Sequence, residues 1–206
     1  ILLKHFNEEI LLKAKSIGFS DTRISKISKV NIRKINSLKN KYKFSAKFKN
    51  IDTCAGEFQS FTPYMYSTWA FDHRDNKYEE ETKVTKKKKV IIIGGGPNRI
   101  GQGIEFDYCC VHSSYAIKEI GIESIMINCN PETVSTDFDT SNRLYFEPLD
   151  IESVLEICNA ENSDGNLLGV IVQLGGQTPL KLAEQIHDNK IPILGTGYQS
   201  IDICED

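Results

Sequence analysis

Three short stretches of this sequence combine glycine with small polar side chains, and glutamates accompany two of them. Residues 94–103 read Gly-Gly-Gly-Pro-Asn-Arg-Ile-Gly-Gln-Gly, residues 128–137 include Asn-Pro-Glu, and residues 174–178 read Leu-Gly-Gly-Gln-Thr. Glycine lets a backbone approach a ligand closely. Arg99 is the single cation in these stretches, whereas a triphosphate requires Lys or Arg and Mg²⁺-binding carboxylates. The composition therefore favours a small polar ligand or a lined passage.

The elements around these stretches would bring them together. The expected strands are 90–93, 124–127, 144–146, 168–172 and 191–194. The expected helices between them are 105–120, 151–158 and 179–187. This alternation predicts an α/β fold with a mostly parallel, Rossmann-like sheet and right-handed crossovers. Loops after parallel strands meet at one edge of such a sheet, where ligands bind.

Two nucleotide-binding fingerprints fail in the glycine-rich turn. The dinucleotide pattern G-x-G-x-x-G, counted from Gly94, meets Arg99 at its sixth position. The P-loop pattern, counted from Gly96, meets Gln102 where lysine is required. The strand at 124–127 also lacks a terminal acid for a ribose hydroxyl. A nucleotide-dependent oxidoreductase is therefore the weakest interpretation, and absence of NAD(H) binding would remove it.

Individual charged residues also have purely structural explanations. Glu105 begins an expected helix, where a carboxylate is favoured by about 0.3–1 kcal/mol. Glu132 follows a proline in a loop, where acids are common. Arg99 can form a salt bridge with Asp107 or Asp137. From the residues alone, the structural interpretation is favoured for Glu105 and Glu132, whereas both interpretations stay open for Arg99.

The composition indicates an ordinary globular protein in a reducing compartment. The chain has 206 residues, of which 40% are hydrophobic and 26% charged, and no apolar run approaches the roughly 20 residues that span a bilayer. Six cysteines form no C-x-x-C pair, and four scattered histidines give no metal-binding spacing. We expect a cytoplasmic protein. The chain starts without Met or a signal peptide and ends without a closing element, which indicates a segment of something longer.

The first fifty residues differ in charge from the rest. They hold thirteen Lys or Arg against three Asp or Glu, so the remainder is strongly acidic. Asn7, Ser20 and Asn31 each precede a short apolar-striped segment and can cap a helix. Three basic helices could bind nucleic acid, but the aromatics do not interleave with the cations as a stacking platform requires. We therefore favour the explanation that these lysines form a solvated outer face of a helical bundle.

Between this region and the glycine-rich turn, residues 51–71 alternate aromatic and small polar side chains, which predicts an extended crossing segment. Residues 72–88 are almost all polar and end in a lysine run, which indicates a linker or surface insertion.

Three long motifs resemble the second synthetase half of the carbamoyl phosphate synthetase large subunit. They are residues 94–108, 128–137 and 175–180, in the family's order and spacing. The resemblance implies that 89–206 is a pre-ATP-grasp α/β domain and that 1–50 is the end of a helical oligomerisation domain. It implies a fragment, inactive alone, of a ligase that makes carbamoyl phosphate from bicarbonate, ammonia or glutamine, and two ATP, in pyrimidine or arginine biosynthesis.

The resemblance also implies roles for individual residues. Glutamates at the positions of Glu105 and Glu132 are associated with the passage that carries carbamate between the two active sites. The residues expected beside them are Gly103, Asn98, Arg99, Asn130 and Gln177. No catalytic, metal-binding or cofactor-binding residue is expected in this segment, because the family's ATP-grasp residues and Mg²⁺ ligands lie downstream.

The expected partners follow from the same resemblance. They are the remaining synthetase domains, a glutaminase domain or subunit, and a further copy of the chain bound through the helical segment, with neither nucleic acid nor membrane. The alternative, a nucleic-acid-binding module with basic helices and a regulatory α/β domain, would show steeply salt-dependent duplex binding.

Overall fold

The computed structural model describes residues 6–69, 80–96 and 104–205, and it divides the chain into two compact units. The helical unit comprises Ile1–Lys49 and Ser67–Glu81, and the sheet unit comprises Asn50–Tyr66 and Thr82–Asp206. The domain boundaries expected near residues 50, 71 and 88 stay predictions.

The helical unit contains three helices whose starts were predicted from their capping residues. They are α1 (Glu8–Ser16), α2 (Asp21–Ser28) and α3 (Ile32–Tyr42). The side chains of Asn7, Ser20 and Asn31 accept hydrogen bonds from backbone N–H groups in the first turn of each helix. Leu11, Ile24, Ile35 and Phe44 form the core of this unit.

Some expected apolar stripes are only partly buried. Ile17 and Ile27 are 61% and 50% exposed, because helices this short cover little more than one turn of each neighbour. In addition, two of the basic residues do not belong to a solvated face. Lys15 and Lys39 both pair with buried Asp21, at 3.1 and 2.9 Å, and both lie over the Trp69 ring.

The sheet has six strands in the order β1-β2-β5-β4-β3-β6. Their bounds are β1 (Lys47–Asn50), β2 (Tyr64–Thr68), β3 (Lys89–Ile93), β4 (Glu123–Asn128), β5 (Arg143–Phe146) and β6 (Leu167–Ile171). The pairs β2–β5, β5–β4, β4–β3 and β3–β6 are all parallel. The predicted mostly parallel α/β sheet is confirmed.

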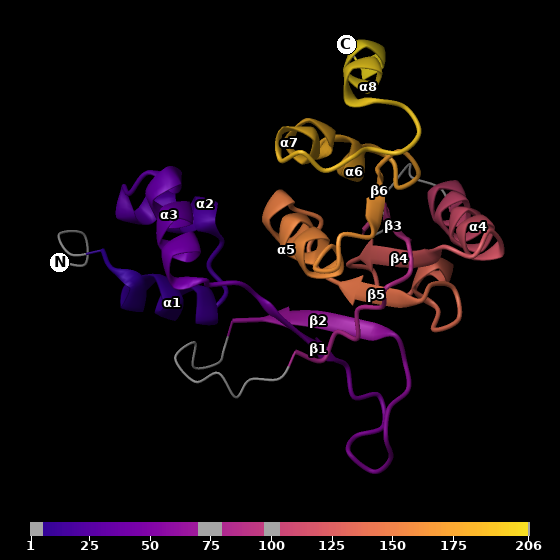
Figure 1. Ribbon diagram of the computed structural model, residues 1–206, viewed down its shortest axis with the longest axis horizontal. Coiled ribbons are helices and arrows are strands. Elements are labelled where there is room, and N and C mark those ends of the chain that lie inside the picture. The colour runs from indigo at the N-terminus through magenta and orange to yellow at the C-terminus, as the bar shows by residue number, and fades with distance from the viewer. Residues whose placement is uncertain (1–5, 70–79, 97–103, 206) are drawn as a thin grey trace. The chain divides into compact units, whose positions relative to one another are not determined.

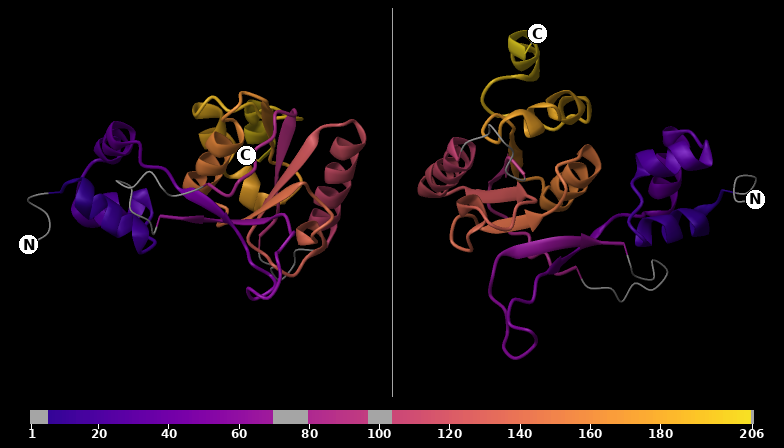
Figure 2. Two further views of the ribbon diagram at one scale, coloured as in Figure 1. Left: turned by 60° about the horizontal axis from the view of Figure 1, so that its bottom comes forward. Right: turned by 180° about the vertical axis from the view of Figure 1, so that it is seen from behind.

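Helices cover both faces of this sheet. They are α4 (Glu105–Glu119), α5 (Ile151–Glu161), α6 (Gln177–Leu180) and α7 (Ala183–Asp188), and the last helix, α8 (Tyr198–Glu205), packs against α7. Figures 1 and 2 show α4 on one side of the sheet and α5, α6 and α7 on the other. This follows from right-handed crossovers, since α4 leads from β3 towards β5 whereas α5 leads back from β5 to β6. None of the helices in the described residues is long and apolar enough to cross a bilayer.

Two sequence predictions were wrong in detail. The helix expected at 179–187 is split into α6 and α7, because the Leu182 N–H bonds to Pro179 O, three residues back, and tightens the chain there. The strand expected at 191–194 is reduced to a single bridge between Val170 and Ile193. Pro192 has no N–H to continue a ladder. The sequence analysis also missed β1, α8 and the short 3₁₀ turn η1 (Val134–Thr136).

A buried ionic cluster fixes the amino-terminal edge of the sheet, opposite the loops of interest. Arg143 Nε lies 2.6 Å from Glu161 Oε1, and its NH2 group contacts Glu161 at 2.8 Å and Glu123 at 2.9 Å. The Tyr145 hydroxyl donates to Glu161 Oε1 at 2.6 Å. Burial and then the Glu161 charge raise the pKa of Tyr145 well above its ordinary value, so the phenol stays protonated.

Candidate functional site

The three polar stretches lie at the carboxyl ends of β3, β4 and β6, which form one edge of the sheet because these strands are parallel. The chain leaves β3 towards β4 and β5 and later returns to the other side of β3 as β6. The strand order therefore reverses at β3. Open α/β sheets bind their ligands at such a reversal.

Asn128, the last residue of β4, connects two of these loops. Its side chain is buried, and its Oδ1 accepts hydrogen bonds from the N–H of Gly96 at 3.1 Å and of Asn130 at 3.2 Å. Its Nδ2 donates to Ser135 Oγ at 3.1 Å. A single amide thus holds both the turn after β3 and the loop after β4.

Two glycines permit backbone approaches that no other residue would allow. A methyl group at Gly94 would lie 2.6 Å from Asn128 Nδ2. A methyl group at Gly175 would lie 2.6 Å from the carbonyl carbon and oxygen of Gly94. The loop after β6 therefore rests directly on the turn after β3, at the point where a dinucleotide would have to enter.

The loop after β4 is ordered by its own side chains and by the first turn of α4. Asp107 Oδ2 accepts from the N–H of Ser135 at 3.0 Å. The N–H of Glu132 donates to Asn130 Oδ1 at 3.0 Å, and Thr136 Oγ1 donates to Thr133 O at 2.7 Å. The start of α4 and the loop that carries Glu132 are thereby joined.

Comparison with known proteins shows the family to which this chain belongs. Residues 86–203 match the family described as the carbamoyl phosphate synthase preATP-grasp domain. The chain belongs to this family. It is 56% identical over 198 residues to the carbamoyl phosphate synthase large chain of Rhizobium meliloti, covering 96% of this chain and 17% of that protein. The large chain of Vibrio cholerae is 52% identical over 202 residues, covering 97% and 18%.

The chain therefore spans less than a fifth of the length of these curated relatives. Among solved structures, the biotin carboxylase domain of a thermophilic 2-oxoglutarate carboxylase bound to ADP aligns with a TM-score of 0.36 and 18% identity, over 57% of this chain and 25% of that one. We base no argument on so low a score.

In this pre-ATP-grasp domain the two expected passage glutamates are both exposed. Glu105 is the first residue of α4, as predicted, and Glu132 lies in the loop after β4. Asn130 is half-buried between Asn128 and Glu132, and Gln177 is exposed at the start of α6. Asn98, Arg99 and Gly103 lie outside the described residues, and the passage roles of all seven residues stay predictions.

The described loop residues give this edge an acidic character. Their charged side chains, together with the first turn of α4, are Glu105, Asp107, Glu132 and Asp137, and neither Lys nor Arg occurs in the described parts of residues 94–103, 128–137 and 174–178. A triphosphate is usually bound by cations, so these side chains do not favour one, and the lack of ATP binding by this segment stays a prediction.

Two of the six cysteines, Cys110 and Cys158, are buried. Burial raises the pKa of both Cys110 and Cys158 to about 12, so these thiols are poor nucleophiles. The described part of the chain contains no cluster of three His, Cys, Asp or Glu side chains that could hold a metal ion.

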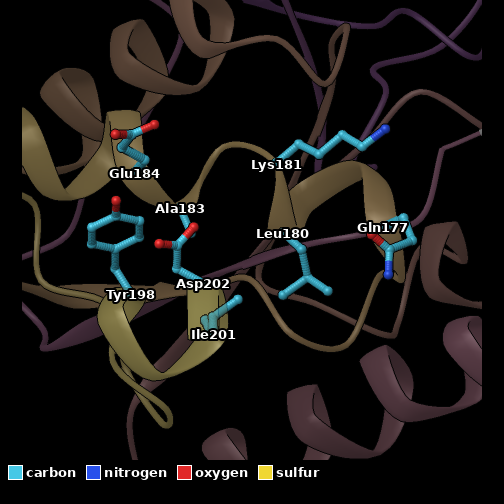
Figure 3. Close-up of a pocket in the computed structure, with 8 residues that line it drawn as sticks. All are labelled: Gln177, Leu180, Lys181, Ala183, Glu184, Tyr198, Ile201 and Asp202. Carbon is cyan, nitrogen blue, oxygen red and sulfur yellow. The ribbon is translucent and has the colours of Figure 1, made fainter. Parts of the chain in front are cut away.

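A pocket of about 280 Å³ lies beside these loops, between α6, α7 and α8. Figure 3 shows Glu184 facing the Tyr198 hydroxyl, with Asp202 nearby and Gln177 at the far end. Leu180, Ala183 and Ile201 provide its apolar surface. Gln177 is the one expected passage residue among its described lining residues, so the pocket is not the centre of the site.

The sequence analysis missed the residues that organise the site. Asn128 was noted only for lacking a ribose-binding carboxylate, and neither Asp107 nor Ser135 was given this role. The sequence did offer one signal. Asn128 ends a buried-strand pattern, and the glycines at 94–96 end the strand that is expected beside it. An amide that follows a strand can satisfy N–H groups of a neighbouring turn.

Proposed function

We propose that this chain is part of a carbamoyl phosphate synthase large chain, which makes carbamoyl phosphate from bicarbonate, ammonia or glutamine, and ATP. In this proposal, the loops after β3, β4 and β6 form one wall of the passage that delivers carbamate to the second phosphorylation site. Glu105 and Glu132 line it, together with Asn98, Arg99, Gly103, Asn130 and Gln177.

The observation that carries the proposal is the hydrogen bonding of Asn128 to Gly96, Asn130 and Ser135. These hydrogen bonds fix the shape of the loops without any contribution from a bound ligand. A passage needs such walls because carbamate decomposes in bulk water, and a confined polar channel excludes water.

The carboxylates at this edge of the sheet also favour the passage of carbamate over its tight binding. Carboxylates repel anionic carbamate, so Glu105 and Glu132 would not trap it, while the neighbouring amides offer hydrogen bonds to it in passing. The same repulsion would favour the release of carbamate at the second phosphorylation site.

ATP and Mg²⁺ are required by the proposed reaction but are assigned to other parts of the large chain. The rim of the described loops is acidic, and the contact of Gly175 with Gly94 closes the crevice between β3 and β6. We therefore propose that a glutaminase and the remaining synthetase domains complete the enzyme around this domain, and that the helical unit serves in oligomerisation.

The test is carbamoyl phosphate formation from bicarbonate, ammonia and ATP. A large chain carrying this sequence should form it, whereas the 206-residue chain alone should not. Formation by the 206-residue chain alone would contradict the proposed division of labour. No formation by the large chain, with ammonia supplied directly, would contradict the function itself.

A further inference from the structure

The loop between β1 and β2, residues 51–63, carries two aromatic side chains that the described structure leaves in solvent. Phe58 and Phe61 are 77% and 86% exposed. Figure 1 shows this loop extending away from the sheet beyond β2, and Figure 2 shows the same from behind. Two neighbouring exposed phenylalanines on a protruding loop are unusual for a surface that remains in water.

The first half of the loop is nevertheless firmly shaped. Asp52 accepts hydrogen bonds from the N–H of Cys54 at 2.9 Å and of Gly56 at 2.6 Å. Ala55 and Gly56 both adopt the left-handed conformation, with φ of 52° and 73°. A non-glycine residue rarely adopts this conformation, so the Asp52 carboxylate holds a turn that the backbone alone would not favour.

The base of the loop is closed by a second set of hydrogen bonds. Thr53 Oγ1 and Ser60 Oγ lie 2.9 Å apart, and Ser60 Oγ also donates to Ile51 O at 3.3 Å. Asn50 Nδ2 donates to Thr62 O at 2.9 Å. The loop therefore has a defined shape that does not depend on its phenylalanines, and both of them are left available for another surface.

We propose that Phe58 and Phe61 form a docking knob that inserts into an apolar, basic-rimmed cavity on another part of the large chain. Preorganised loops lose little conformational entropy on binding, and buried aromatic anchors dominate interface energies. Residues 50–66 contain Asp52 and Glu57 but no Lys or Arg, so the partner surface should carry the positive charges.

The choice of partner rests on the proposed function, namely that this chain is part of a large chain. The match to the Rhizobium meliloti protein covers 96% of this chain but 17% of that protein, so most of the polypeptide lies outside these residues. A partner on the same polypeptide is present at high effective concentration. This favours it over a second copy or a separate protein.

The test uses a large chain carrying this sequence, with photoreactive benzoylphenylalanine in place of Phe58, Phe61 or Ile120. Ile120 is 72% exposed at the end of α4 and serves as the matched control. Mass spectrometry then maps each cross-link. We expect links from positions 58 and 61 to a region of the same polypeptide outside these 206 residues, with Lys or Arg near the linked site, and only background at 120.

A second measurement keeps the test independent of cross-linking chemistry. Phe58→Ser with Phe61→Ser should raise the rate of protease cleavage within residues 51–63 by about 30-fold, the factor that loss of one strong aromatic anchor gives. Ile120→Ser should leave that rate unchanged.

Background cross-linking at all three positions, or links between copies, would overturn the proposal, as would equal cleavage rates in all variants. Neither readout requires turnover. If a large chain makes no carbamoyl phosphate but shows the expected links, the proposed function is contradicted and the docking proposal still holds.

Discussion

The side-chain oxygen of Asn128 accepts a hydrogen bond from the backbone N–H of Gly96 at 3.1 Å. This bond joins the end of β4 to the glycine-rich turn after β3. Because the same amide also binds Asn130 and Ser135, the turn and the neighbouring loop form one ordered unit. Glu105 and Glu132 extend from the two segments that this unit connects.

Replacing Asn128 by alanine should therefore destabilise the domain by about 1–3 kcal/mol, the cost of leaving a buried polar group without a partner. Asn128→Asp keeps the acceptor for Gly96 and Asn130, and the Ser135 hydroxyl can turn to donate to it. We expect a smaller loss for this variant at neutral pH. Urea unfolding of the two variants measures the difference, and equal losses would contradict the role of the side-chain oxygen.

The local parts of the fold could be predicted from sequence. A capping side chain bonds to N–H groups two or three residues away, so Asn7, Ser20 and Asn31 were identified from their immediate neighbours. The buried strands and their parallel order followed from apolar runs alternating with helices. Glu105 at the first position of α4 was predicted in the same way.

The parts that depend on tertiary contacts could not be predicted. The role of Asn128 requires the turn after β3 to lie beside the end of β4, which no local pattern states. The burial of Lys15 depends on its pairing with Asp21 in the next helix, so a charged residue was expected in solvent. The apolar run at 191–194 suggested a strand, but Pro192 limits its pairing to one bridge.

The contact of Gly175 with Gly94 gives a graded prediction for three glycine substitutions. Gly175→Ala should be the most damaging, because its methyl group would meet backbone atoms at 2.6 Å. Gly94→Ala should cost less, since the nearest atoms belong to the Asn128 side chain and not to the backbone, so that a shift of this side chain at the expense of its hydrogen bonds can relieve the clash. Gly197→Ala, with nothing within 4 Å, is the control. Thermal unfolding should rank them in this order, and a mild Gly175→Ala would show that the two loops are not in contact.

Removal of Glu161 should be strongly destabilising. Glu161→Ala leaves Arg143 buried with Glu123 as its remaining carboxylate in the cluster and removes the acceptor of the Tyr145 hydroxyl. Breaking a buried ion pair in this way typically costs about 3–5 kcal/mol. Asn159→Ala, an exposed position on the same helix, should be nearly neutral in denaturant unfolding. A loss for Glu161→Ala no larger than that of the control would refute the prediction.

The acid stability of the domain should depend in part on Asp164. Hydrogen bonds from Asn166, and then from Lys89, lower the pKa of Asp164 from 3.8 to about 2. A carboxylate with a lowered folded-state pKa stabilises the fold above its unfolded pKa and loses this contribution as the pH falls through its folded pKa. The stability advantage over Asp164→Asn should thus be constant above about pH 5 and shrink between about pH 4 and 2. A pH-independent difference would contradict it.

The passage itself is tested most directly by ammonia-dependent carbamoyl phosphate formation in a large chain carrying Glu105→Ala and Glu132→Ala. Glu119→Ala, an exposed glutamate at the other end of α4, is the control. The ATPase activities of the two partial reactions are followed in the same samples. If the two glutamates line the carbamate passage, synthesis falls while both partial reactions and the control keep the parent's rates. Unchanged synthesis would show that the two carboxylates only order a helix start and a loop.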